Sequence, residues 1–259
     1  MAARKMTRLY PEELPARMPV LDQHHNPTVL YRVLYWIANH SLATRADIAL
    51  AMGLDMSTPS AKKVSVERVR RACTTLEEHK FIEQSVIKFW RLKLHMIRLT
   101  AGGDKYCQNS YPWEIKNSDW DKLYNRHNGR IDREHAAAVL NFAYHARLRG
   151  WETVVMPYEF ETNSEPDVMI KKGYEITYVE VEMRGWRASK KFRKWELQAE
   201  LQGRPAACLL TTEAANNIAI RFQELGYSNY DVTSLEYLQA TAYNAKRSNG
   251  LWQFTTEER

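Results

Sequence analysis

The sequence predicts a mixed α/β protein in two parts, the first built of helices and a small hairpin and the second built around a mixed sheet. The first observation is periodicity: residues 28–107 show three amphipathic helices and then two β-rich runs, whereas residues 132–235 follow the order α, β, β, β, α, β, α, β. The second is charge: residues 1–110 carry 17 Lys and Arg against 10 Asp and Glu, and residues 111–259 carry 20 against 21. We therefore expect domains at 1–110 and 132–259 and a linker at 111–131.

The three N-terminal helices are predicted from apolar spacing and capping residues. Apolar residues recur at helical spacing over 29–37, a second helix begins at Thr44 and ends at Gly53, and a third runs from about Val64 to His79. The expected core stripe of the third helix consists of Val66, Val69, Cys73 and Leu76. The basic and polar side chains expected outside that stripe are Lys62, Lys63, Arg68, Arg71 and Thr75.

Two β-like runs, at 81–84 and 92–99, follow the third helix, and Lys88 and Arg91 lie in the segment that joins them. Three helices, a hairpin and the closing run Leu-Thr-Ala-Gly-Gly at 99–103 resemble a winged helix-turn-helix domain. The resemblance implies that the third helix and the hairpin bind double-stranded DNA. The excess of positive charge favours a polyanionic partner. A winged helix that binds protein is the alternative.

The C-terminal elements are predicted in the same way. We expect a helix from Asp132 to Leu148, stopped by Gly150, and strands at 151–160, 167–170 and 176–183. A polar turn at 171–173 joins the last two strands into a hairpin. A helix at 188–201, a buried strand at 206–210, a helix at 214–225 and a strand at 230–235 complete the order. A sheet covered by helices on both faces follows from it.

Three carboxylates are placed at the ends of two neighbouring strands. Side chains alternate along a strand, so Glu180 and Glu182 leave on one face, and the hairpin brings Asp167 beside them. Acids so clustered repel one another unless a cation is present, and Mg²⁺ (or Mn²⁺) binds carboxylate oxygens together with water and phosphate. The alternative is a set of acids that is only solvated.

The run Pro166, Asp167, then Glu180, Val181, Glu182 resembles the PD-(D/E)XK, or restriction-endonuclease-like, superfamily over roughly 132–235. The resemblance implies a metal-dependent nuclease in which Asp167 and Glu180 hold the metal. Glu182 stands where a lysine is common and would act as a ligand or a water-orienting base.

The resemblance suggests further site residues. Glu134, near the start of the first C-terminal helix, is a candidate additional metal ligand, although a glutamate there also complements the helix dipole. His135 is interpreted as a surface histidine, with approach to the site as the alternative. Lys190 is a candidate to contact phosphate or to replace the missing lysine, and the sequence does not separate it from Lys194, one turn further on. A solvated basic face is the other explanation of both lysines.

These observations together predict a DNA-binding, metal-dependent endonuclease that hydrolyses phosphodiester bonds in the context of a mobile element or plasmid. The layout also loosely resembles plasmid replication-relaxation proteins. The alternative is a non-catalytic transcription or replication regulator with a degenerate nuclease fold, which the missing lysine favours. A homodimer and recruitment by a mobile-element partner protein both remain open. We expect a cytoplasmic protein, because there is no long apolar run, and no disulfide framework or zinc site, because the three cysteines are far apart.

Overall fold

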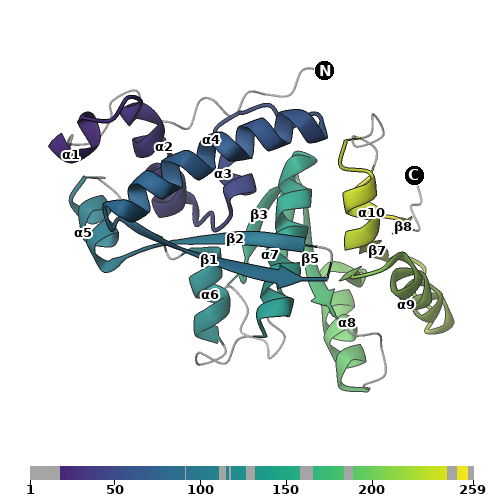
Figure 1. Ribbon diagram of the computed structural model, residues 1–259. Coiled ribbons are helices and arrows are strands. Elements are labelled where there is room, and N and C mark those ends of the chain that lie inside the picture. Colours follow the sequence, from purple (N-terminus) through teal and green to yellow (C-terminus); the bar gives the residue numbers. More distant parts are fainter. Residues whose placement is uncertain are drawn as a thin grey trace. The chain divides into compact units, whose positions relative to one another are not determined.

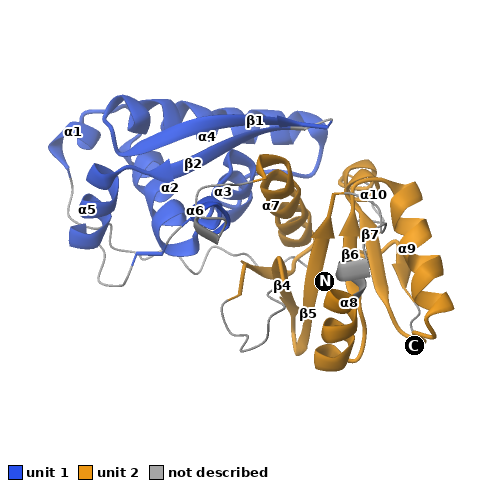
Figure 2. Ribbon diagram, turned by 90° about the horizontal axis from the view of Figure 1, so that it is seen from below, with its two compact units in different colours: residues 1–131 blue, residues 132–259 orange. Residues whose placement is uncertain are grey.

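The computed structural model describes residues 18–90, 92–110, 115–116, 118–126, 132–157, 166–183, 189–243 and 250–255. The chain divides into two compact units, residues 1–131 and residues 132–259 (Figure 2). Both units combine helices with strands, so the predicted mixed α/β class is confirmed. Within the described ranges, no helix has the length and apolar character needed to cross a bilayer.

The first unit places its helices around a two-stranded sheet. Helices α2, α3 and α4 pack against one another, and α2, α3 and α4 each contact the β1–β2 hairpin (Figure 1). The elements are α1 (Pro19–Asp22), α2 (Pro27–His40), α3 (Arg45–Ala51), α4 (Pro59–Glu78), β1 (Ile82–Phe89), β2 (Leu92–Leu99), α5 (Ala101–Ser110) and α6 (Asp119–Arg126).

Helix α4 begins earlier than the start near Val64 that we predicted. Thr58 caps it by accepting a hydrogen bond from the Ala61 amide, and Pro59 occupies its first turn. None of the residues 59–64 is buried, so apolar spacing did not reveal this part of the helix. The expected core stripe is also partly wrong, because Val66 is only half-buried, whereas Ser65 and Ala72 join Val69, Cys73 and Leu76 in the core.

The hairpin is longer than predicted. Strand β1 continues to Phe89, and its antiparallel register with β2 runs from Ile82 opposite Leu99 to Phe89 opposite Leu92. Lys88 therefore lies within the strand and not in the connection. The alternation changes at Val86 and Ile87: Val86, which has the parity of buried Ile82, is exposed, whereas Ile87 and Phe89 are buried.

The run at 99–103, which we expected to close the domain, spans the end of β2 and the start of helix α5. Gly103 lies against the start of the hairpin: a Cβ at this position would lie 1.9 Å from the carbonyl oxygen of Phe81. The Gly103 amide donates a hydrogen bond to the Thr100 hydroxyl at 3.0 Å. Helix α5 can approach the backbone of Phe81 this closely only because residue 103 has no side chain.

The segment that we expected as a linker contains α6 and packs within the first unit. The Lys116 amide donates to the Ala38 carbonyl at 2.8 Å, and the Asp119 amide donates to the Ser41 carbonyl at 2.7 Å. Trp120 and Leu123 are buried. The segment is therefore held against α2 by backbone hydrogen bonds and apolar burial.

The second unit contains a six-stranded sheet in the order β3-β4-β5-β6-β7-β8. Its β5–β6 and β6–β7 pairs are parallel, and its β3–β4, β4–β5 and β7–β8 pairs are antiparallel. The elements are α7 (Arg133–Leu148), β3 (Glu152–Val155), β4 (Val168–Lys172), β5 (Glu175–Glu182), α8 (Ser189–Gln202), β6 (Ala206–Leu209), α9 (Thr212–Glu224), β7 (Asp231–Ser234), α10 (Leu235–Ala240) and β8 (Phe254–Thr255).

The predicted order of elements from α7 to β7 is confirmed. The expected strand at 151–160 is described as β3 over only four residues, and residues 158–160 lie outside the described part of the chain. The sequence missed α10 and β8. Six residues capped by Ser234 and two residues paired with β7 are too short to show a period.

Helices cover both faces of this sheet. On one face Trp195 of α8 and Phe222 of α9 pack with Ala207, Leu209 and Val232. Val179 and Val181 of β5 point to the other face of the sheet, because the β5–β6 register places Glu180 and Glu182, and not these valines, beside Ala207 and Leu209. Both valines are buried, and α7 contacts β3, β4 and β5. Helices α7 and α10 are joined where Arg149 donates to the Leu238 carbonyl at 3.1 Å.

Candidate active site

The β4–β5 hairpin brings the first two predicted acids together. Its register runs from Lys172 opposite Glu175 to Val168 opposite Val179, so the next position places Asp167 opposite Glu180. The turn is Gly173–Tyr174, and Gly173 adopts φ +65°, a conformation that glycine takes without strain. At the other end of the hairpin β4 begins at Val168, whereas β5 continues past Val179 to Glu182 beside β6. The acids therefore lie where the two strands stop pairing.

Asp167 is buried and held on several sides. Its Oδ2 accepts a hydrogen bond from the Val181 amide at 2.9 Å and lies 3.3 Å from His135 Nε2. Its backbone carbonyl accepts from the Met156 amide at 2.9 Å. Burial alone would raise the pKa of Asp167, but the contacts from His135 and Val181 stabilise the carboxylate and bring that pKa below its ordinary value.

His135 reaches this carboxylate from the first turn of α7. Asp132 caps the helix by accepting from the amides of Glu134 and His135. His135 Nε2 lies 2.9 Å from the Val181 carbonyl as well as near Asp167. Burial would lower the pKa of His135, but Asp167 raises it above its ordinary value. The interpretation of His135 as a surface histidine is therefore wrong, because its side chain belongs to the carboxylate site.

Glu180 is 1% exposed and pairs with a lysine from α8. Lys194 Nζ lies 3.1 Å from Glu180 Oε2, and the Lys194 side chain is 41% exposed. The other oxygen, Oε1, is buried and has no hydrogen-bond partner among the described residues. Burial and then the charge of Asp167 raise the pKa of Glu180 to about 8, even though Lys194 opposes this change. Near neutral pH this carboxyl therefore binds a proton unless further positive charge is present.

Glu182, the last residue of β5, is half-buried and has the same parity as Glu180. Its charge raises the pKa of both Glu180 and His135. Glu134 is exposed, and it is His135, not Glu134, that contacts Asp167. Within the described residues, no three or more His, Cys, Asp or Glu side chains are grouped as metal ligands. The structure thus brings together Asp167, Glu180, His135 and Lys194.

The helix after β5 places one of the two lysines that the sequence left equivalent. Lys194 contacts Glu180, whereas only the backbone of Lys190 lies in the described part of α8. Both lysines follow the strand on a helix that crosses the same face of the sheet, and their spacing of one turn gave no reason to prefer either.

The predicted DNA-binding residues of the first unit differ in their surroundings. Lys63, Arg68 and Lys88 are exposed, whereas Lys62 and Thr75 are half-buried. Burial lowers the pKa of Lys62, against the attraction of Asp47. Arg71 is exposed but lies 3.2 Å from Glu67, which also binds Arg70. Arg91 lies outside the described residues.

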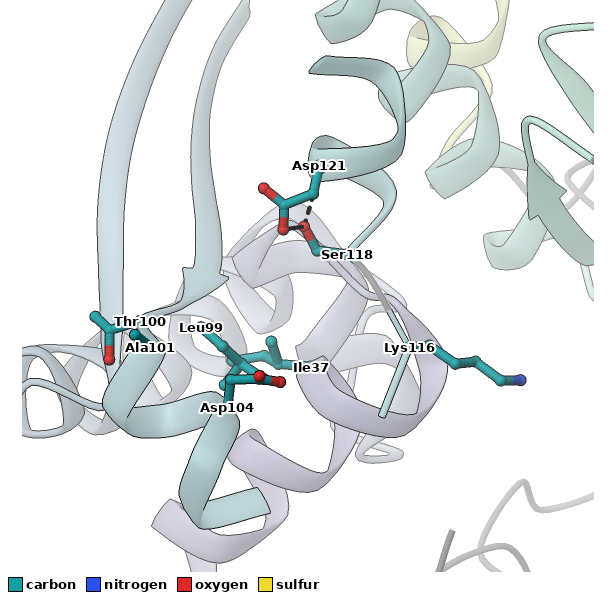
Figure 3. Close-up of a pocket in the computed structure, with 8 residues that line it drawn as sticks. All are labelled: Ile37, Leu99, Thr100, Ala101, Asp104, Lys116, Ser118 and Asp121. Atoms are coloured by element: carbon teal, nitrogen blue, oxygen red, sulfur yellow. Dashed lines mark hydrogen bonds between the residues drawn. The ribbon is translucent and has the colours of Figure 1, made fainter. Parts of the chain in front are cut away.

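A cavity of about 170 Å³ is also present in the first unit, where α5 and α6 meet the end of β2 (Figure 3). On its wall Ser118 caps α6: the Ser118 hydroxyl accepts a hydrogen bond from the Asp121 amide at 3.1 Å and donates one to the Asp121 carboxylate at 2.6 Å. The lining residues are Ile37, Leu99, Thr100, Ala101, Asp104, Lys116, Ser118 and Asp121. None of the predicted site residues lines this cavity.

Comparisons of the chain with protein-family models, with curated proteins and with solved structures gave no match.

Proposed function

We propose that the protein is a DNA-binding endonuclease that hydrolyses phosphodiester bonds with the help of Mg²⁺ or Mn²⁺. One observation carries the proposal: Asp167 and Glu180 meet at the point where β4 and β5 stop pairing, and Lys194 approaches Glu180 from the following helix. Two carboxylates and a lysine at such a fork are the groups that the PD-(D/E)XK resemblance requires. The usual lysine position on the strand is taken by Glu182.

The donor set suits a hard divalent cation. Glu180 Oε1 is buried and has no hydrogen-bond partner in the part of the chain that the structure describes, and the Asp167 carboxylate lies beside this side chain. Oxygen donors of this kind are those that Mg²⁺ takes, usually together with water and phosphate oxygens. Asp167 and Glu180 would hold the ion. When bound, it would supply charge neutralisation for the phosphate and a lowered pKa for water.

The remaining side chains have separate roles in this proposal. Lys194 is partly exposed, so its ammonium group can leave Glu180 and pair with the phosphate that is to be cut. His135 holds Asp167 in place through its contacts with Oδ2 and with the Val181 carbonyl. Glu182 orients the attacking water or accepts its proton. Both side chains come from the elements that border the carboxylates, Lys194 from α8 and Glu182 from β5.

The first unit would deliver the substrate. Helices α2, α3 and α4 followed by the β1–β2 hairpin have the order of a winged helix, in which α4 enters the major groove. The first 110 residues carry 17 basic against 10 acidic residues, so this unit attracts the phosphate backbone more strongly than the nearly neutral remainder. Double-stranded DNA is therefore the proposed partner.

The test is cleavage of supercoiled plasmid by the full chain in the presence of Mg²⁺ or Mn²⁺. Asp167→Asn should abolish cutting, because it removes the charge that holds the metal while it changes the side-chain volume little. Glu152→Gln is the matched control, since Glu152 is an exposed strand carboxylate on β3. Cutting that survives in Asp167→Asn would place the activity elsewhere, including in a contaminating nuclease.

A second function is favoured by the pairing of Glu180 with Lys194. The Lys194 ammonium group already lies 3.1 Å from Glu180, and Glu182 stands where a lysine is usual. A non-catalytic transcription or replication regulator would need no more than this, since the contact would serve only the fold. Such a regulator would bind DNA without cutting it in any metal, and Asp167→Asn would leave that binding unchanged.

A further inference from the structure

Val64 is an apolar side chain in an unusual setting. It lies in the second turn of α4 and is 69% exposed, the largest exposure of any large apolar residue that the structure describes in the first unit. β-Branched residues do not favour helices, and this valine adds little buried area to the core. The side chain therefore contributes little to folding and remains available to a partner.

The neighbours of Val64 indicate which partner. At 3.6 residues per turn, the side chains around it on α4 are those of Ser60, Glu67, Arg68 and Arg71, and the buried stripe lies on the other side of the helix. Lys63 is exposed next to it. Single exposed apolar residues are common on protein surfaces, but this one lies beside Lys63 and Arg68, and Arg71, which is paired with Glu67, follows about two turns along the helix. A polyanion with an apolar group at its surface fits this combination better than an apolar protein surface.

Double-stranded DNA offers one such group. In the major groove the only apolar substituent on the base edges is the C5 methyl of thymine, and small apolar side chains read it by contact. Arg68 and Arg71 lie one and two turns further along α4, where they would reach guanine edges or phosphates. We propose that Val64 contacts a thymine methyl group and so gives the protein a preference for thymine at one position of its DNA site. The inference rests on the proposed binding of DNA through α4.

The experiment begins with selection of bound duplexes from a random-sequence pool by the full-length chain. In the enriched duplex each thymine is then replaced in turn by deoxyuridine, which has the same hydrogen-bonding groups and lacks only the methyl. At one position the replacement should weaken binding of the wild type about fourfold, which corresponds to about 0.8 kcal/mol for one methyl-sized group. Val64→Ala should bind thymine and deoxyuridine equally at that position.

Val154→Ala is the matched control, because Val154 is also an exposed valine but lies on β3, in the second unit and outside the elements proposed to bind DNA, and it should keep the thymine preference. The inference would be overturned if deoxyuridine weakened the binding of the wild type and of Val64→Ala equally. A pool in which no sequence is enriched would also overturn it. Unchanged DNA binding by Val64→Ala would likewise overturn it and would indicate a protein partner for this surface. Failure of the wild type to bind any duplex would overturn the DNA-binding proposal itself, which makes the two failures distinguishable.

Discussion

Lys194 Nζ lies 3.1 Å from Oε2 of Glu180, and the two belong to elements that follow each other in the chain, α8 and β5. The lysine is partly exposed and the carboxyl is buried, so within this pair solvent reaches the lysine side chain and not the carboxyl group. A cation that arrived at the carboxylates would compete with this ammonium group. The pair therefore sets how strongly the site can respond to metal, to phosphate and to pH.

The first prediction concerns pH. The folded-state pKa of Glu180, about 8, lies above its ordinary value of 4.5, so its contribution to stability is complete below about pH 4.5 and is lost as the pH rises towards 8. Glu180→Gln cannot ionise, and its melting temperature should fall less than that of the wild type between these pH values. Thermal melts without divalent metal measure the difference. Parallel curves for the two proteins would show that Glu180 does not titrate in this range.

The second prediction concerns metal. Mg²⁺ or Mn²⁺ should raise the melting temperature of the wild type, because an ion that binds only the folded state stabilises it, by about 2.7 kcal/mol at about 100 times its dissociation constant. Asp167→Ala should lose the shift, whereas Glu152→Ala should keep it. The shift should also be larger near pH 8 than near pH 6, since metal and proton compete for Glu180. An equal shift in Asp167→Ala would locate the metal elsewhere.

The third prediction assigns a structural task to His135. His135→Ala removes the imidazole from the buried Asp167 carboxylate, and loss of one partner of a buried polar group typically costs about 1–3 kcal/mol. The pKa of His135 is raised, so this stabilisation is present in acid and is lost as the pH rises through that pKa. Urea unfolding at several pH values should show that the difference in free energy of unfolding between the wild type and His135→Ala becomes smaller at high pH. His25→Ala, at an exposed position, provides the control.

The fourth prediction distinguishes two arginines on α4. Arg68→Ala should weaken duplex binding several-fold and reduce the slope of log affinity against log salt by about 0.9 if one phosphate contact is lost. Arg71→Ala should have a smaller effect, because Arg71 is paired with Glu67. Fluorescence anisotropy across a salt series with the full chain measures both. Equal losses from these variants and from Lys171→Ala, in the second unit, would argue against α4 as the main DNA contact.

The fifth prediction separates enzyme from regulator at Glu182. Glu182→Ala should abolish cleavage and leave DNA affinity nearly unchanged, because the proposed groove contacts belong to the first unit. The variant should be at least as stable without metal, since removing this charge relieves repulsion with Glu180. Plasmid nicking, anisotropy and a thermal melt report the three properties. A wild type that never cuts, under any metal, would leave the regulator as the remaining reading.

The sequence predicted the acids of the site better than their partners. Strand alternation and a short turn suffice to place Asp167 opposite Glu180, because both depend only on neighbouring residues. His135 and Lys194 come from helices 32 residues before Asp167 and 14 residues after Glu180. Which side chain of a helix meets a strand depends on how the helix is rotated about its axis when it packs. An amphipathic pattern shows which broad face of the helix is buried, but it does not distinguish neighbouring side chains at the edge of that face. The sequence therefore suggested Glu134 as a candidate metal ligand and His135 as a surface residue, and it left Lys190 and Lys194 equivalent.

The errors in the first unit concern features that apolar spacing does not record. The start of α4 is set by Thr58 and Pro59 in a stretch with no buried residue, so a search for apolar spacing begins too late. Close packing of Gly103 on Phe81 is equally invisible in a linear pattern, since the glycine in the run 99–103 also suits a turn. Both features depend on backbone geometry and not on the count of apolar residues.

The tight turn at Gly173–Tyr174 makes the candidate site depend on chain length as much as on residue identity. A single residue inserted into β5 between Tyr174 and Glu180 would move every following side chain to the opposite face of the sheet. Glu180 would then point towards the side of Val181, and a valine would take its place beside Asp167. Many substitutions on this hairpin leave the pairing intact, whereas one insertion or deletion would separate the two acids at once. Over evolutionary time such a hairpin tolerates substitutions far more readily than insertions or deletions.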